Sequence, residues 1–315
     1  MKNSNFLFPK EQYLTDGGFE TTLIFFKGFN LNYFAAFELL KSEKGLDAMS
    51  EYYEPYLKLA EKYQLGFVLE SPTWRANTDW GRKLGYTDEK LFEINRQSIR
   101  FIRSLAKPYE HLVPDILISG NIGPRGDGYK AENKMTPDEA NRYHLTQINA
   151  FALEDVDLVT AMTLTYSDEA IGIVNAARSL NLPVVISFTV ETDGTLPGGE
   201  TLQEAIEWTD RVTGYYPEHF MINCAHPEHF IEQLEKAGRW KNRIKGIRAN
   251  ASLKSHAELD ESETLDTGDA CLLSEGYMRI LDLLPELKVV GGCCGTDERH
   301  IEEICKAFVN KLAYA

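Results

Sequence analysis

Residues 288–296 read KVVGGCCGT: a short apolar run that ends in two glycines, two adjacent cysteines and a third glycine. Short apolar, β-branched runs are typical of buried strands in parallel sheets. Neighbouring side chains on a regular strand point to opposite faces, so Cys293 and Cys294 can face one point only where the chain leaves the strand. The flanking glycines allow such a departure. The segment therefore predicts a buried strand whose C-terminal end presents two thiols.

Seven similar runs precede this one and alternate with longer amphipathic segments. The eight expected strands are 13–16, 67–70, 115–120, 158–163, 184–189, 220–223, 244–249 and 288–291. The helix-like segments are 50–63, 89–106, 137–154, 168–179, 201–212, 227–237 and 297–312. Eight apolar strands alternating with helices in 315 residues fit an α/β fold, a single (β/α)8 TIM barrel, better than a doubly wound sheet. No change of composition marks a boundary, so we expect one domain over residues 1–315.

Composition and charge exclude several classes of partner. The formal net charge of −15 argues against a nucleic acid or an anionic membrane surface, because both require a positive footprint. No stretch approaches the roughly 20 apolar residues of a membrane span, and residues 1–9 lack the pattern of a signal peptide. Five cysteines in a long chain do not indicate a secreted disulfide framework. We therefore expect a cytoplasmic protein; its oligomeric state is left open.

A third cysteine, Cys224, ends another predicted strand, and a TIM barrel places its active site at the C-terminal ends of its strands. Three thiolates that converge from two strand ends predict an open zinc site with a fourth position free for a substrate. Zinc suits soft thiolates in a tetrahedral arrangement. The alternative, three buried structural thiols, is less favoured. We interpret Cys271 and Cys305 as structural.

Other polar residues follow the predicted strands. The Asp16-Gly17-Gly18 motif is either a turn or a carboxylate that holds an ammonium group at the barrel mouth. Asn223 either orients the metal site through hydrogen bonds or satisfies loop backbone. His226 precedes a proline outside the strand, and we expect a structural role for it.

Together these motifs resemble the homocysteine S-methyltransferase family, which includes S-methylmethionine- and betaine-dependent enzymes and the homocysteine module of cobalamin-dependent methionine synthase. The resemblance covers essentially the whole chain. It is carried by Asp16-Gly17-Gly18, Gly123-Pro124, Asn223-Cys224 and Gly291-Gly292-Cys293-Cys294-Gly295. It implies that zinc is held by the three cysteines and takes the homocysteine sulfur as fourth ligand. The implied partners are a small-molecule thiol and a methyl donor, for which we expect a small sulfonium such as S-methylmethionine or S-adenosylmethionine.

The chain departs from the family at one substrate position. Where the family carries glutamate and threonine at the end of the fourth strand, this sequence has Met162 and Thr163, and methionine is a poor acceptor for an ammonium group. Three explanations remain open: Asp16 alone holds the amino group, Glu70 substitutes for the missing glutamate, or the acceptor is not homocysteine.

Three arginines, Arg75, Arg125 and Arg248, lie at or just beyond predicted strand ends. They are either surface groups paired with local acids or groups that bind an anionic substrate.

The leading hypothesis for the function is zinc-dependent methyl transfer to homocysteine. The alternatives are the same transfer to a different, more anionic thiol, or a metal- or thiol-binding barrel without turnover. We expect the polar residues 252–267 to form a solvated loop.

Overall fold

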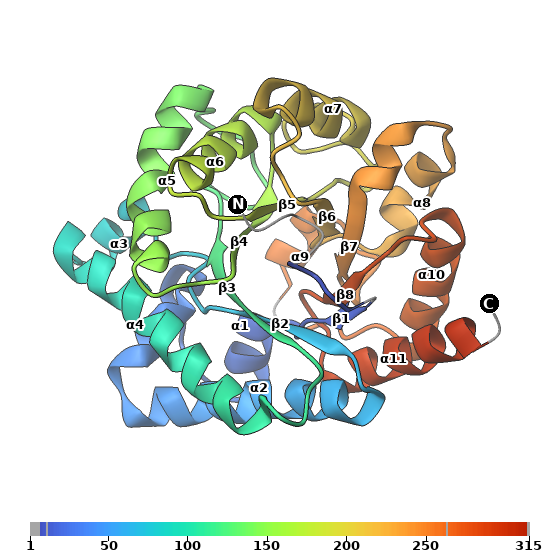
Figure 1. Ribbon diagram of the computed structural model, residues 1–315, viewed down its shortest axis with the longest axis horizontal. Helices are drawn as coiled ribbons and strands as arrows, with labels where there is room; N and C mark the ends of the chain where they lie inside the picture. Colours follow the sequence, from blue (N-terminus) through green and yellow to red (C-terminus); the bar gives the residue numbers. More distant parts are fainter. Residues whose placement is uncertain (1–6, 11, 263, 314–315) are drawn as a thin grey trace.

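The computed structural model describes residues 7–10, 12–262 and 264–313. Eight parallel strands close into a barrel in sequence order, and helices surround it (Figure 1). The strands are β1 (Tyr13–Leu14), β2 (Gly66–Glu70), β3 (Ile116–Ile122), β4 (Leu158–Leu164), β5 (Val184–Phe188), β6 (Phe220–Asn223), β7 (Ile244–Ala249) and β8 (Val289–Gly292). The predicted TIM barrel is confirmed, and every strand boundary lies within two residues of its prediction. The sequence pattern of residues 1–9 argued against a signal peptide; of these, residues 1–6 lie outside the described residues.

The helices lie mostly outside the strands (Figure 1). They are α1 (Phe19–Thr21), α2 (Glu43–Tyr63), α3 (Thr78–Lys83), α4 (Asp88–Ala106), α5 (Pro137–Ala152), α6 (Ser167–Ser179), α7 (Leu202–Thr213), α8 (Pro227–Glu235), α9 (His256–Asp260), α10 (Ala270–Leu283) and α11 (Glu298–Ala313). Helix α2 begins well before the predicted residue 50, because the side chain of Ser42 caps it by accepting from the Gly45 N–H.

Strand register explains why polar groups gather at one end of the barrel. An apolar layer fills the interior, and it includes Val68, Leu117, Leu158, Val185 and Met221. Side chains two residues further along a strand point to the same face. Those positions hold Glu70, Ser119, Thr160, Ser187 and Asn223, all of which are buried. The barrel interior therefore changes from apolar to polar toward the C-terminal ends of the strands.

Closure of the barrel brings the first and last strands together. Leu14 of β1 pairs with Val290 of β8. Arg248 of β7 lies between Asn223 of β6 and Gly291 of β8 in the same row of the sheet. The residues that follow β1, β6 and β8 are thus neighbours in space although they are far apart in sequence.

The prediction of a solvated loop at residues 252–267 is correct only in part: among the described residues of the segment only Ser252 and His256 are buried, but a helix and two cavity-lining leucines were not expected. The segment contains α9, which lies over the centre of the barrel in Figure 1, and Leu259 and Leu265 line a cavity. A capping box between Ser255 and Glu258 begins this short helix, which explains how so polar a stretch becomes ordered. Residue 263 lies outside the described residues.

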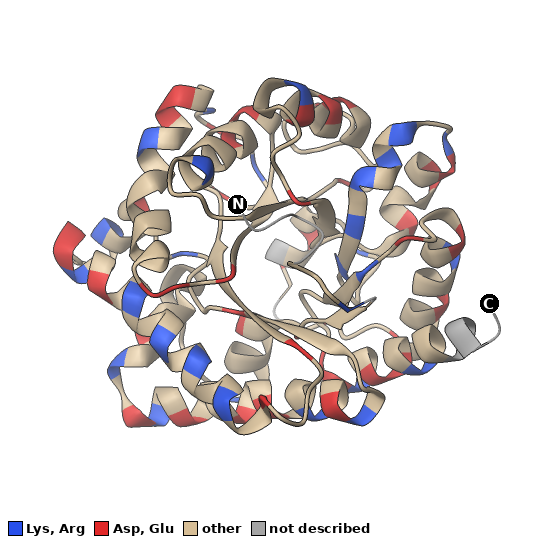
Figure 2. Cartoon of the chain, in the orientation of Figure 1, with Lys and Arg blue, Asp and Glu red and all other residues tan. Residues whose placement is uncertain are grey.

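Charged side chains lie mainly on the outer helices, whereas the strands are largely uncharged (Figure 2). Within the described part of the chain, no helix is both long and apolar enough to span a membrane.

Candidate metal and substrate site

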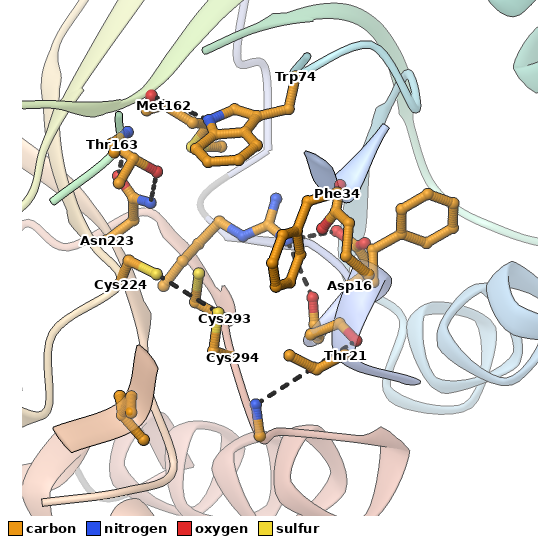
Figure 3. Close-up of a pocket in the computed structure, with 18 of the residues that line it drawn as sticks. Asp16, Thr21, Phe34, Trp74, Met162, Thr163, Asn223, Cys224, Cys293 and Cys294 are labelled. Carbon is orange, nitrogen blue, oxygen red and sulfur yellow. Dashed lines mark hydrogen bonds and ion pairs between the residues drawn. The ribbon is translucent and has the colours of Figure 1, made fainter. Parts of the chain in front are cut away.

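Three cysteine sulfurs meet at the C-terminal end of the barrel (Figure 3). Cys224 directly follows β6, and Cys293 and Cys294 directly follow β8. Their Sγ atoms all lie within 4.8 Å of one another, and those of Cys224 and Cys294 are 3.6 Å apart. Cys224 leaves its strand with φ of +59°, and Gly295 after the vicinal pair has φ of +80°. The chain thus departs from the strands at the points where the sequence required it.

The three thiols fit a metal ion by both chemistry and spacing. Sulfurs about 2.3 Å from a tetrahedral zinc lie about 3.8 Å from one another, close to the observed separations. All five cysteines are free thiols, so no disulfide competes for the site. Hydrogen bonds from the Cys224 and Cys294 thiols, assisted by the nearby charge of Arg248, hold the pKa of Cys293 well below its usual value. Of the other two cysteines, Cys305 is buried in the core and Cys271 is exposed on α10, away from the site.

Asn223 ties the metal site to the end of β4. Its Oδ1 accepts from the Thr163 N–H at 2.8 Å, and its Nδ2 donates to the Thr163 hydroxyl at 2.8 Å (Figure 3). Oδ1 also accepts from the Ser187 hydroxyl at 2.6 Å. Thr163 has φ of +61°, a strained conformation for a β-branched residue. Asn223 therefore satisfies the backbone of Thr163 beside the metal site, and because none of these bonds reaches a cysteine, the orienting role stays a prediction. His226 caps α8 by accepting from the Glu228 N–H, so the structural role predicted for it is confirmed.

Asp16 is already engaged within the protein. Arg248 Nη2 donates to Asp16 Oδ1 at 2.6 Å, and the Tyr52 hydroxyl donates to Asp16 Oδ2 at 2.9 Å. Arg248 also donates to the carbonyls of Gly17 and Gly292. Burial opposes the charge on Arg248, but the carboxylates of Asp16 and Glu70 raise its pKa. The pair fixes the β1 end against β7 and β8.

The glycines of the Asp16-Gly17-Gly18 motif permit this close approach. A Cβ atom on Gly18 would lie 2.6 Å from the Cys293 carbonyl oxygen and 2.4 Å from the Thr21 hydroxyl. A side chain there would push the β1 end away from the cysteines.

Tyr129, in the loop after β3, was not among the predicted site residues. Its hydroxyl lies 3.2 Å from Cys224 Sγ and 3.7 Å from Cys294 Sγ. Its ring stacks on His256 at 4.0 Å, and His256 Nε2 contacts the Cys224 carbonyl at 2.8 Å. The signal in the sequence was the Gly126-Asp127-Gly128-Tyr129 turn after a strand end.

A cavity of about 300 Å3 adjoins the cysteines. Its walls include Glu20, Phe34, Glu70, Trp74, Arg75 and Met162. Met162 presents no charge to the cavity, and its carbonyl accepts from Trp74 Nε1 at 3.3 Å (Figure 3). Glu70 is buried, and its Oε2 has no hydrogen-bond partner among the described residues. Burial raises the pKa of Glu70 to about 7.

The three predicted arginines have different environments. Arg75 lines the cavity and is buried, whereas Arg248 lines the cavity but is paired with Asp16. Arg125 is not among the residues that line the cavity; its Nε donates to Asp79 at 2.7 Å near the surface. The structure thus brings two of the three arginines to the site.

Comparisons with known proteins identify chains similar to this one. The YbgG homocysteine S-methyltransferase of Bacillus subtilis (strain 168) is 25% identical over 203 residues, which cover 61% of this chain and 61% of that relative. Crystal structures of the Escherichia coli homocysteine methyltransferase MmuM share the fold. Its oxidized form has a TM-score of 0.75 at 17% identity, and its metallated form has a TM-score of 0.75 at 16% identity. Each superposition covers 96% of this chain and 99% of the MmuM chain.

A family model described as homocysteine S-methyltransferase matches residues 13–308, a range that includes all eight strands and the three cysteines. The resemblance drawn from the sequence motifs is therefore confirmed, and the chain belongs to the homocysteine S-methyltransferase family.

Proposed function

We propose that this protein transfers a methyl group from a small sulfonium donor to the thiol of homocysteine, with zinc held by Cys224, Cys293 and Cys294. The observation that carries the proposal is the convergence of three thiols, spaced as zinc ligands are, beside a cavity. A metallated form of MmuM and the name of YbgG support the same chemistry. When bound, zinc supplies a site where a substrate thiol is deprotonated at neutral pH.

The protein groups around the cavity have separable roles. The three cysteine thiolates supply negative charge that keeps a bound sulfur nucleophilic. Phe25, Phe34 and Trp74 line the cavity with aromatic rings, and ring faces attract cations such as a sulfonium. A sulfonium donor leaves as a neutral sulfide, so the transfer needs no general acid.

Glu70 is the group best suited to replace the glutamate missing at Met162. Asp16 is occupied by Arg248 and Tyr52, whereas Glu70 Oε2 is buried without a partner and lines the same cavity. An ammonium group would satisfy that oxygen with a charge-assisted hydrogen bond. We therefore assign the amino group of homocysteine to Glu70.

A thiol acceptor that carries a carboxylate but no ammonium is the second candidate. It is favoured by the neutral side chain of Met162 and by the engagement of Asp16 with Arg248. Its chemistry at the metal site is the same, so only the acceptor distinguishes the two.

The test is methionine formation by zinc-loaded protein, measured by mass spectrometry with isotopically labelled homocysteine. The label separates methionine made from the acceptor from methionine released by S-methylmethionine. S-methylmethionine and S-adenosylmethionine are supplied in parallel, with Cys294→Ala as control. Labelled methionine above the control establishes the activity, and the faster donor identifies the subclass. Zinc-loaded protein that methylates neither homocysteine nor a desamino thiol acceptor with either donor refutes the proposal and favours a non-catalytic barrel.

A further inference from the structure

One buried cation at the cavity has no partner of opposite charge. Arg75 is only 6% exposed and lines the cavity, yet no aspartate or glutamate in the described part of the chain forms an ion pair with it. Burying a charge without a partner is costly, so proteins rarely do so without a compensating group. Arg248, the other arginine at the cavity, has its carboxylate.

The surroundings of Arg75 fix the guanidinium in one plane. Its central carbon lies 4.0 Å from the ring centroid of Trp74 and 4.3 Å from that of Trp80. Nη1 donates to the Gly126 carbonyl at 2.6 Å, while Nε is buried and has no hydrogen-bond partner. Rings of two tryptophans and one backbone carbonyl thus hold the group, and the edge formed by Nε and Nη2 has no hydrogen-bond acceptor among the described residues. That edge is the face through which arginine binds a carboxylate with two parallel hydrogen bonds.

We propose that Arg75 binds a carboxylate of one of the substrates through this unused edge. The inference rests on the proposed function, because it assigns one recognition group to the same cavity. Homocysteine and S-methylmethionine each carry a carboxylate, so the chemistry is shared by acceptor and donor.

The charge around Arg75 favours a carboxylate over a dianion such as phosphate. Asp127 and Glu20 lie near enough to influence Arg75 electrostatically, although neither pairs with it. A dianion would meet one unpaired cation and two carboxylates in a largely buried site. A single planar monoanion matches one guanidinium edge in both charge and geometry.

The first experiment compares acceptors that differ by one group: homocysteine, 4-mercaptobutyrate without the amino group, and 3-mercaptopropylamine without the carboxylate. Thiol binding is followed by the visible absorption of cobalt-substituted protein, and methyl transfer by mass spectrometry. Removing a hydrogen-bonded charge of this kind typically weakens binding about 10- to 100-fold. If the carboxylate belongs to the acceptor, wild-type protein should discriminate against 3-mercaptopropylamine by that factor. Arg75→Met should reduce the discrimination to within about threefold, and Arg75→Lys should restore only part of it.

The second arm keeps the acceptor fixed and compares S-methylmethionine with its decarboxylated analogue, (3-aminopropyl)dimethylsulfonium. If Arg75→Met penalises only S-methylmethionine, the carboxylate belongs to the donor. Arg125→Met is the matched control, since Arg125 also follows the end of a strand but pairs with Asp79 outside the cavity. It should leave both preferences unchanged.

A third arm tests the inference without turnover. Trp74 and Trp80 stack on Arg75, so a carboxylate bound there should change tryptophan fluorescence. Butyrate should produce a saturable change in tryptophan fluorescence in wild-type protein and in Arg125→Met, but not in Arg75→Met. Cooperative thermal unfolding of Arg75→Met shows that this variant is folded. Unchanged substrate preferences and an unchanged butyrate response in Arg75→Met would overturn the inference while leaving methyl transfer intact. A saturable response in protein that methylates no thiol would instead support the inference and refute the proposed function.

Discussion

The buried Arg248–Asp16 pair should be a major stabilising contact of the barrel, and Arg248→Met tests this. The substitution removes a 2.6 Å ion pair between β7 and the end of β1, together with donations to the Gly17 and Gly292 carbonyls at 3.3 Å and 3.0 Å. Asp16 would keep only the Tyr52 hydroxyl as a side-chain partner among the described residues.

The expected loss follows from the burial of the pair. Both side chains are less than one-tenth exposed, so Asp16 would be left as a buried carboxylate without its counter-charge. Breaking such a pair from one side typically costs about 3–5 kcal/mol. Asp16→Asn in the Arg248→Met background removes the stranded charge. The double variant should therefore be more stable than the sum of the single losses predicts, by about 2 kcal/mol.

The assay is equilibrium urea unfolding of the wild type, Arg248→Met, Asp16→Asn and the double variant. Unfolding is followed by circular dichroism in reducing buffer with a chelator. Arg279→Met breaks the exposed ion pair with Glu228 and serves as control, with an expected loss below about 1 kcal/mol. A loss in Arg248→Met no larger than in this control would refute the reasoning. Additive effects of the two site substitutions would show that the charges do not compensate each other.

Three further predictions concern the site. Cys294→Ala should lower zinc content well below the about one ion per chain expected of the wild type, whereas Cys271→Ala should not; metal analysis after dialysis decides. Tyr129→Phe should weaken zinc binding by about 10- to 100-fold, because its hydroxyl contacts the Cys224 sulfur; competition with a chelator measures this, and unchanged affinity contradicts it. Burial raises the pKa of Glu70 to about 7, so its carboxylate becomes able to accept an ammonium as the pH rises through that value. The kcat/KM for homocysteine, divided by that for 4-mercaptobutyrate, should therefore rise with pH in the wild type and in Glu20→Gln. In Glu70→Gln the same ratio should not change with pH.

The strands could be predicted because each carries its information locally. An apolar side chain and, two residues later, a polar one face the barrel interior, as in Val68 and Glu70 or Met221 and Asn223. The cysteine cluster was also predictable, because a vicinal pair between glycines and a third cysteine both follow strand ends. Parallel strands of one barrel bring those ends together whatever the loops do.

The contacts that could not be predicted join residues far apart in sequence through loop conformation. Arg248 and Asp16 are separated by 232 positions and meet only because β1 lies beside β8 in the closed sheet. Tyr129 reaches Cys224 from a loop that carries no strand or helix pattern. The segment containing α9 is mostly polar, so its composition indicated solvent and gave no sign that two of its leucines would line the cavity.

These contacts narrow the explanations for Met162, which stands where the family has a glutamate. The sequence alone left three explanations, and the ion pair with Arg248 makes Asp16 the weakest of them. Two buried groups of opposite charge then remain at the cavity, each with one polar atom that has no hydrogen-bond partner among the described residues: Glu70 (Oε2) at the end of β2 and Arg75 (Nε) five residues beyond it. An amino acid carries both complementary charges on one carbon. If one acceptor satisfies both groups, its ammonium lies toward the polar layer inside the barrel and its carboxylate toward the loop after β2. Glu70 of β2 would then replace the glutamate missing from β4, and the substrate would be turned relative to one whose ammonium is held at β4. Homocysteine should consequently lose affinity in both Glu70→Gln and Arg75→Met, whereas 4-mercaptobutyrate should lose it only in Arg75→Met. Equal effects of Glu70→Gln on the two acceptors would exclude this orientation.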